Sequence, residues 1–121
     1  MIQAALYVTE GNELCGFRVS EHGEGIVCAA VSALCLNAVN SLEGLTDCGL
    51  AYRYNKKGGY VECLLPGILA GEDEPMAGLL LRSLAMGLEH LKEIYGIELR
   101  VEQKPREYKL LKKKGVYTFK R

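Results

Sequence analysis

The chain has 121 residues, 49% of them hydrophobic and 25% charged, which suits one compact globular domain with a modest core. No stretch reaches the ~18 to 20 uninterrupted apolar residues of a membrane span. The N-terminus, Met-Ile-Gln-Ala-Ala-Leu, lacks the basic, apolar and cleavage regions of a secretory signal. We therefore expect a cytoplasmic protein with no membrane contact.

Two hairpin strands and a glycine-containing loop open the chain. Residues 2–9 and 14–20 are strand-like and flank a Glu-Gly-Asn turn, which predicts a hairpin. The loop Gly23-Glu24-Gly25 follows, and apolar residues at helical period then predict a helix over 27–43. We expect Gly44 to end this helix.

A second hairpin and a second helix follow. Residues 50–54 and 60–65 flank Asn-Lys-Lys-Gly-Gly, whose glycines permit the positive φ of a tight turn. An Asp-Glu pair before Pro75 is suited to cap a helix that runs to about Tyr95 and stops at Gly96, and 97–101 reads as a last strand. The order ββαββαβ predicts a two-layer α/β sandwich: a mixed, mostly antiparallel sheet of about five strands with two helices on one face.

The charges are unevenly placed along the chain. Residues 104–121 hold eight basic residues and one acidic residue (net +7), whereas 1–103 hold seven basic and fourteen acidic (net −7). We expect a single α/β domain over 1–103 and a basic C-terminal extension over 104–121. Such an extension is suited to weak contact with RNA or an acidic surface, and an ordinary solvated tail explains the same pattern.

Cysteine usage points to one reactive thiol. Five cysteines without a Cys-x-x-Cys pair argue against a disulfide framework and a compact zinc site, so we expect most to be buried and inert. Cys28 differs because it lies in the opening turn of the first predicted helix, six residues after His22. A nearby imidazole and a helix N-terminus both favour the thiolate. We expect a cysteine nucleophile with no metal or cofactor.

Each of these residues also has an ordinary structural interpretation. An unpaired cysteine is commonly a small core residue, and a Gly-x-Gly connection is commonly a plain strand-to-helix turn. His22 by itself fits a surface imidazole, and His90 on the second helix fits a solvated one. A reversible redox role for Cys28 is a further alternative, although no resolving cysteine lies at a motif spacing.

The segment Gly16-Phe-Arg-Val-Ser-Glu-His22, followed by Gly-Glu-Gly-Ile-Val-Cys-Ala-Ala-Val-Ser-Ala-Leu34, resembles the ribosomal-processing cysteine proteases of the Prp family. That family carries a Gly-His-Ala element after its second strand, a glycine-rich loop and an Asp-Ile-Val-Cys-Ala-Ala-x-Ser-Ala helix start. The resemblance covers residues 1–102. The chain departs from the pattern at Glu21, Gly23 and Gly25, which stand for glycine, alanine and aspartate, and in its shorter loop.

The resemblance implies a dyad of Cys28 as nucleophile and His22 as base, in a cysteine endopeptidase. The implied substrate is the N-terminal extension of a large-subunit ribosomal protein, the twenty-seventh, and the implied assembly is a homodimer. Ser32 matches the motif serine, in a supporting role. The alternative is a noncatalytic ribosome- or RNA-associated module of the same fold, in which Tyr108, Tyr117 and Phe119 among the lysines contact RNA.

Sequence position also suggests supporting groups for hydrolysis. Gly23 and Gly25 give the loop freedom to bring His22 toward Cys28. The amides of Cys28 and Ala29, with a contribution from Gly25, are candidates for an oxyanion hole. Substrate contact is expected from amphipathic tyrosines on the second hairpin, namely Tyr52, Tyr54 and Tyr60, for which ordinary sheet packing is the alternative.

Overall fold

A computed structural model describes residues 2–20, 25–55, 59–104, 110–113 and 116–119. His22 and Gly23 lie outside the described residues. A five-stranded sheet forms the centre, in the order β3-β4-β2-β1-β5, with β5 parallel to β1 and the other neighbours antiparallel. Its strands are β1 (Gln3–Val8), β2 (Leu14–Ser20), β3 (Ala51–Tyr54), β4 (Tyr60–Leu64) and β5 (Glu98–Gln103).

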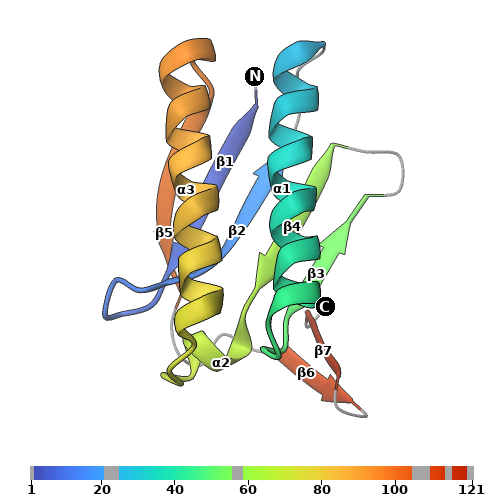
Figure 1. The fold of residues 1–121 in the computed structure, drawn as a ribbon, viewed down its shortest axis with the longest axis vertical. Helices are drawn as coiled ribbons and strands as arrows, with labels where there is room; N and C mark the ends of the chain where they lie inside the picture. The colour runs from blue at the N-terminus through green and yellow to red at the C-terminus, as the bar shows by residue number, and fades with distance from the viewer. Residues whose placement is uncertain (1, 21–24, 56–58, 105–109, 114–115, 120–121) are drawn as a thin grey trace.

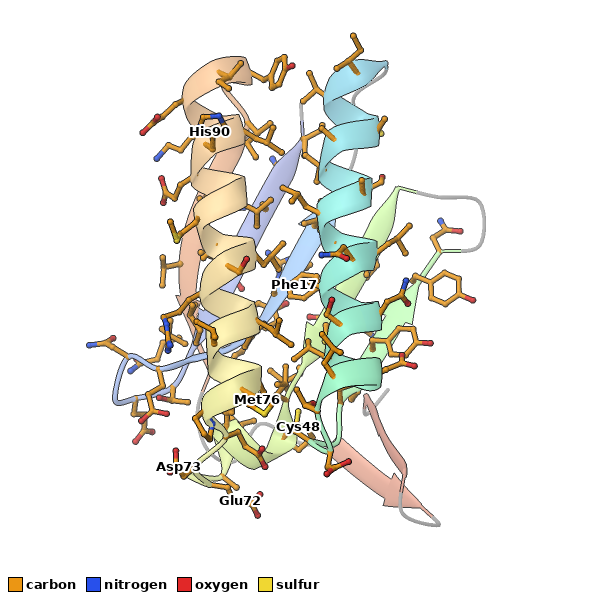
Figure 2. All side chains as sticks on the ribbon, viewed as in Figure 1. Phe17, Cys48, Glu72, Asp73, Met76 and His90 are labelled. Atoms are coloured by element: carbon orange, nitrogen blue, oxygen red, sulfur yellow. The ribbon has the colours of Figure 1, made fainter. Side chains whose placement is uncertain are left out.

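Two long helices, α1 (Ile26–Leu45) and α3 (Pro75–Tyr95), lie side by side on one face of this sheet (Figure 1). The core between the layers is apolar because strand side chains alternate between faces. Phe17 from β2 points into the space between the helices (Figure 2) and packs with residues such as Leu42 of α1 and Leu88 of α3, all three being fully buried. The predicted two-layer sandwich is confirmed.

The first helix ends later than predicted. α1 continues through Gly44 to Leu45, so the expectation that Gly44 stops it is wrong. The helix ends at Thr46, whose backbone is extended and whose hydroxyl donates a hydrogen bond to the Leu42 carbonyl at 2.6 Å. A side chain that satisfies one of the last helical carbonyls therefore ends this helix, in place of a left-handed glycine.

The second long helix starts and stops near the predicted residues. Pro75 is its first residue, and Gly96 ends it in the left-handed conformation (φ 73°), with its N–H bonded to the Lys92 carbonyl. The N-cap Glu74 makes no side-chain capping hydrogen bond, so the predicted carboxylate cap is not formed there.

Two elements were not predicted. A short helix, α2 (Pro66–Leu69), follows β4, and the C-terminal extension contains a hairpin of β6 (Leu110–Lys113) and β7 (Val116–Phe119). In Figure 1 this hairpin lies at the end of the molecule where α1 ends and α3 begins.

Charged groups occupy the sheet face opposite the helices. Glu62 is 2% exposed and accepts hydrogen bonds from Tyr7, Tyr60 and Arg53. Arg18 forms a two-pronged ion pair with Glu102, at 2.7 and 3.2 Å. Because the buried carboxylate is fully hydrogen-bonded, this polar face is compatible with a stable sheet.

Among the described residues, α1 is the one helix whose length and mean hydropathy of 1.6 satisfy the criteria for crossing a membrane. In this structure it packs on the sheet and against α3, burying Val31, Cys35, Ala38, Val39 and Leu42. The core helix of a globular domain passes the same test, so composition alone decides nothing about a membrane.

Candidate active site

Cys28 is the third residue of α1 and is half-buried. Gly25 is the N-cap of the helix, with φ 76° and ψ −142°, a combination that suits glycine because a Cβ would be strained there. The cap makes no side-chain hydrogen bond to the helix, and the first turn holds no acidic residue. The partial positive charge of the helix N-terminus is therefore directed at the region of the Cys28 thiol.

The amides of this first turn fall into two groups. The Ala29 N–H donates to the Gly25 carbonyl at 3.1 Å, which is the first bond of the helical ladder. The Ala29 amide therefore already has an acceptor within the helix, and its role as an oxyanion-hole donor stays a prediction. By helix geometry, the N–H groups of Ile26 and Val27 have no acceptor one turn back inside the helix. These two amides are therefore further candidates for oxyanion donors, beside the predicted Cys28 amide.

The other cysteines are poor nucleophiles. Cys15, Cys35 and Cys63 are at most 1% exposed. Burial raises the pKa of Cys15 to about 12, despite the charge of Lys104, and raises the pKa of Cys63 to about 12. Burial also raises the pKa of Cys48, which lies near the far end of α1 from Cys28 (Figure 2). Three of these thiols are buried and Cys48 is half-buried with a raised pKa, as expected for inert cysteines.

The dyad of Cys28 and His22 stays a prediction. His22 lies outside the described residues, so no distance to Cys28 is available. His90 is exposed on α3, as expected for a solvated residue (Figure 2). Within the part of the chain that the structure describes, no three His, Cys, Asp or Glu side chains gather closely enough to hold a metal ion.

A groove begins one helical turn beyond Cys28. It has a volume of about 470 Å³ and lies between α1 and the β3–β4 hairpin. Ser32, the residue that matches the motif serine, lies at its α1 wall, and the rings of Tyr52 and Tyr54 stack at 6.1 Å on β3. The groove is lined by Ser32, Cys35, Leu36, Val39, Asn40, Tyr52, Tyr54, Asn55, Gly59, Tyr60 and Val61.

The groove brings Tyr52 and Tyr54 together, whereas the Tyr60 hydroxyl donates to Glu62, which belongs to the opposite face of the sheet. The groove also adds residues that the sequence did not reveal. Leu36 is 59% exposed although it is large and apolar. It lies off the buried stripe of α1, and this offset is the signal that was available in the sequence. An extended chain in this groove would meet an apolar wall and amide and hydroxyl groups.

A family model described as cysteine protease Prp matches residues 1–100. The chain belongs to the Prp cysteine protease family. It is a cysteine protease by this membership, as the helix-start motif predicted. The ribosomal processing cysteine protease Prp of Bacillus subtilis is 30% identical over 107 residues, which cover 84% of this chain and 96% of that protein. The Staphylococcus aureus protein of the same description is 31% identical over 84 residues, covering 69% of this chain and 76% of that one.

Solved structures of similar proteins agree with the fold. An essential ribosomal processing protease Prp from S. aureus, determined with a covalently linked product peptide, has a TM-score of 0.72 and 25% identity. The alignment covers 86% of this chain and 100% of the S. aureus chain. A Streptococcus mutans protein gives a TM-score of 0.71 and 26% identity, with 86% of this chain covering 99% of it. The match to the family model ends at residue 100, before the last part of the chain.

Proposed function

We propose that this protease removes the N-terminal extension of a large-subunit ribosomal protein, the twenty-seventh, with Cys28 as nucleophile and His22 as general base. The observation that carries the proposal is the placement of Cys28: a half-buried thiol in the first turn of an apolar helix, beside a groove. The ribosomal processing role in the descriptions of the bacterial relatives supports the substrate class.

Chain connectivity supports the dyad. Residues 21–25 alone separate the end of β2 at Ser20 from the start of α1 at Ile26. Because consecutive Cα atoms lie about 3.8 Å apart, so short a connection favours the proposal that His22 acts on Cys28. In the proposed reaction the imidazole accepts the thiol proton, the thiolate attacks the scissile carbonyl carbon, and the same proton passes to the leaving amine. Water then hydrolyses the thioester.

The helix N-terminus is proposed to stabilise the negative charge that develops on the carbonyl oxygen. The Ile26 and Val27 amides have no intrahelical acceptor, and Gly25 provides no side-chain cap. Each well-placed donor of this kind contributes roughly 3 kcal/mol to catalysis. Glycine at position 25 has no side chain that could accept a hydrogen bond from these amides.

The groove beside Ser32 is the proposed binding surface for the extended substrate. The S. aureus relative binds a product peptide covalently and, in another structure, a substrate peptide. In this chain, Leu36, Tyr52 and Tyr54 offer apolar area along the groove, while Asn40 and Asn55 offer hydrogen-bonding groups. These features suit a peptide segment that has apolar side chains and a backbone to be paired.

The test is cleavage of a synthetic peptide that spans the extension of the host's own ribosomal protein, followed by mass spectrometry. Cys28→Ala should abolish cleavage, whereas Cys48→Ala, which removes the other half-buried thiol, should retain it. Cleavage by the Cys28→Ala protein at an unchanged rate would remove Cys28 from the mechanism. If the wild-type protein left this peptide intact but still cleaved another substrate, the proposed substrate would be wrong.

The role of His22 has a separate test. The rate of Cys28 alkylation by iodoacetamide, measured against pH, reports the thiolate fraction. His22→Ala should slow alkylation near neutral pH and lower the cleavage rate by about a hundredfold to ten-thousandfold, the usual range of general acid–base help. His90→Ala is the matched control, since that histidine is exposed on α3. An unaltered His22→Ala profile would exclude His22 as the base.

Assembly as a homodimer in the cytoplasm belongs to the same proposal. Several large apolar side chains of α3 are exposed, including Met76, Leu79, Met86 and Ile94, and offer surface for a second copy. Light scattering at several concentrations should give twice the monomer mass.

Membership of a protease family favours this enzyme over the noncatalytic module considered from the sequence.

A further inference from the structure

Strand β5 forms one edge of the sheet (Figure 1). It pairs with β1 over its full length without a register shift, and no other described strand pairs with its outer side. It contains no proline, and Val101 adds an apolar side chain that is 66% exposed. Proteins usually blunt an edge of this kind with a proline, a bulge or a cover, because an open regular edge is a template for a further strand. β5 is therefore suited to pair with another strand.

The hydrogen bonds of β5 to β1 fix which backbone groups face the open side. The Glu98 N–H donates to the Ile2 carbonyl at 3.0 Å, and the Lys104 N–H donates to the Val8 carbonyl at 2.7 Å. Neighbouring residues of a strand direct their N–H and C=O groups to opposite sides. The odd-numbered residues of β5 therefore direct both groups away from β1, and they are Leu99, Val101 and Gln103.

The charged side chains of β5 lie on one face of the sheet, opposite the helices. Arg100 pairs there with Glu98 at 3.3 Å, and Glu102 pairs with Arg18 of β2. Lys104 continues the row, since its ammonium is 3.8 Å from a Glu102 carboxylate oxygen. Residues that stand opposite each other on two paired strands share a face, so this charged row would meet the charged row of the strand that pairs with it.

We propose that two copies of this chain join through their β5 strands, in antiparallel pairing, with Val101 opposite Val101 of the second copy. The inference rests on the homodimer of the proposed function and names its contact. This register sets Arg100 opposite Glu102 and Glu98 opposite Lys104, each twice by the two-fold symmetry. Opposite charges stabilise paired strands, and a two-fold contact requires a surface that complements itself. β5 meets that requirement.

The neighbouring registers fit the charges less well. An axis at Arg100 sets Arg100 opposite itself and Glu98 opposite Glu102, so the charged pairs become repulsive. An axis at Leu99 keeps Glu98 opposite Arg100 but moves the residues opposite Glu102 and Lys104 outside β5. A shift that set odd-numbered residues opposite even-numbered ones would bring opposite faces together, which strand pairing does not allow. The charge pattern therefore selects the proposed axis.

This arrangement leaves the candidate active site open in both copies. The two sheets would form one continuous sheet, with the α3 helix of each copy on the same face of it. Cys28 lies on α1, and the groove lies between α1 and the β3–β4 hairpin, at the edge of the sheet away from β5 (Figure 1). Each copy would thus keep its own groove for peptide.

The first experiment is oxidative cross-linking of the full-length protein that carries Cys28→Ala and Cys48→Ala, which leaves the three buried thiols. In this background Val101→Cys should give a disulfide-linked dimer on a non-reducing gel, with copper phenanthroline as oxidant. Hydrogen-bonded opposite residues have Cα atoms about 5.5 Å apart, which is within disulfide range. Leu99→Cys is the matched control, because the proposed register sets it roughly 14 Å from its counterpart, and it should give no dimer band.

A second experiment tests the charges by analytical ultracentrifugation. Arg100→Glu should weaken the dimer about tenfold, because it sets a carboxylate opposite Glu102 at both symmetry-related positions. Arg82→Glu makes the same charge change at an exposed position of α3 and should leave the dissociation constant unchanged. Thermal unfolding of each variant shows whether the fold is intact.

The outcomes separate this contact from the proposed function. A dimer whose Val101→Cys variant gives no cross-link, or whose Leu99→Cys variant links equally well, overturns the β5 contact alone. Equal weakening by Arg100→Glu and Arg82→Glu overturns it too. A wild-type protein that stays monomeric overturns both the contact and the homodimer. Peptide cleavage by the same wild-type sample tests the protease proposal independently of assembly.

Discussion

Gly25 decides how the thiol is presented. Its φ of 76° and ψ of −142° turn the chain into α1, and Cys28 follows three residues later. Among the residues that the structure describes, a Cβ at Gly25 would meet no heavy atom within 4 Å. Any effect of a side chain at this position therefore comes from backbone strain, without a steric clash.

Replacing Gly25 by alanine should destabilise the protein by about 1 to 3 kcal/mol, because the backbone conformation is unfavourable for a residue with a Cβ. Gly44→Ala is the matched control: a Cβ at Gly44 also meets no described residue within 4 Å, but Gly44 lies within α1 and has no positive φ. That substitution should stabilise by about 0.5 to 1 kcal/mol. Urea unfolding measures both, and equal changes for the two variants would contradict the role given to Gly25.

At the scale of elements, α1 contributes both Cys28, the proposed nucleophile, and one wall of the groove. Its buried stripe packs on the sheet, while Leu36 on another flank faces the groove beside β3. One helix thus couples the position of the thiol to the position of the peptide. Because Leu36 lies about two helical turns from Cys28, we expect changes at Leu36 to affect substrate binding more than the chemical step.

Leu36→Ala should raise KM for the peptide about fivefold with little change in kcat, since losing part of a leucine contact costs about 1 kcal/mol. Leu79→Ala on α3 is the matched control, because Leu36 and Leu79 are both 59% exposed. Steady-state kinetics separate the two constants. A rise in KM of the same size for both variants would argue against the groove.

The sheet holds β5 through a charge pair that spans β1. Hydrogen bonds from Arg18, and then its positive charge, lower the pKa of Glu102. A carboxyl whose pKa is lowered in the folded state contributes stability above its unfolded pKa, about 4.3, and loses it as the pH falls through the folded value.

Glu102→Gln should therefore reduce the free energy of unfolding at pH 7, and the difference from the wild-type protein should shrink as the pH falls from about 5 toward 2. Urea unfolding at a series of pH values measures it. Glu98→Gln is the control, since its carboxylate pairs with Arg100 at the exposed surface, at 3.3 Å, and should contribute little. A constant difference between wild type and Glu102→Gln across this range would exclude the assigned linkage.

At the scale of the whole molecule, the charge is divided between an acidic domain and a basic extension. The domain over 1–103 carries −7, which favours encounter with a basic peptide. Such attraction acts over about a Debye length, roughly 10 Å at 0.1 M salt, and weakens as salt increases.

The value of kcat/KM for a basic ribosomal-protein peptide should fall severalfold between about 50 and 500 mM salt, with kcat nearly constant, because screening reduces encounter without altering the chemistry. A peptide with the same scissile segment and neutral flanks provides the comparison and should respond weakly. Equal salt dependence for both peptides would show that the charge of the domain does not guide the substrate.

Features that depend on residues close together in the chain could be predicted from the sequence. Leu14–Ser20 is the strand that was predicted, and Pro75 and Gly96 bound α3 because proline fits the first turn and glycine permits the left-handed stop. The prediction that Gly44 ends α1 was wrong because its neighbours keep it helical. The helix ends where the Thr46 hydroxyl donates a hydrogen bond to the Leu42 carbonyl. The site motif around Cys28 was likewise local, since nucleophile and helix start are adjacent in the chain.

The sequence by itself determined the order of the five sheet strands and the two long helices and the division of charge, and it singled out the cysteine proposed as nucleophile, because each depends on residues close together in the chain. Only the tertiary structure decided that Ala29 is bonded within the helix, that Leu36 and Tyr52 share one groove, and that Lys104 lies over Tyr7. These contacts join segments whose separation in sequence carries no periodic signal, so the packing of helices on the sheet had to bring them together.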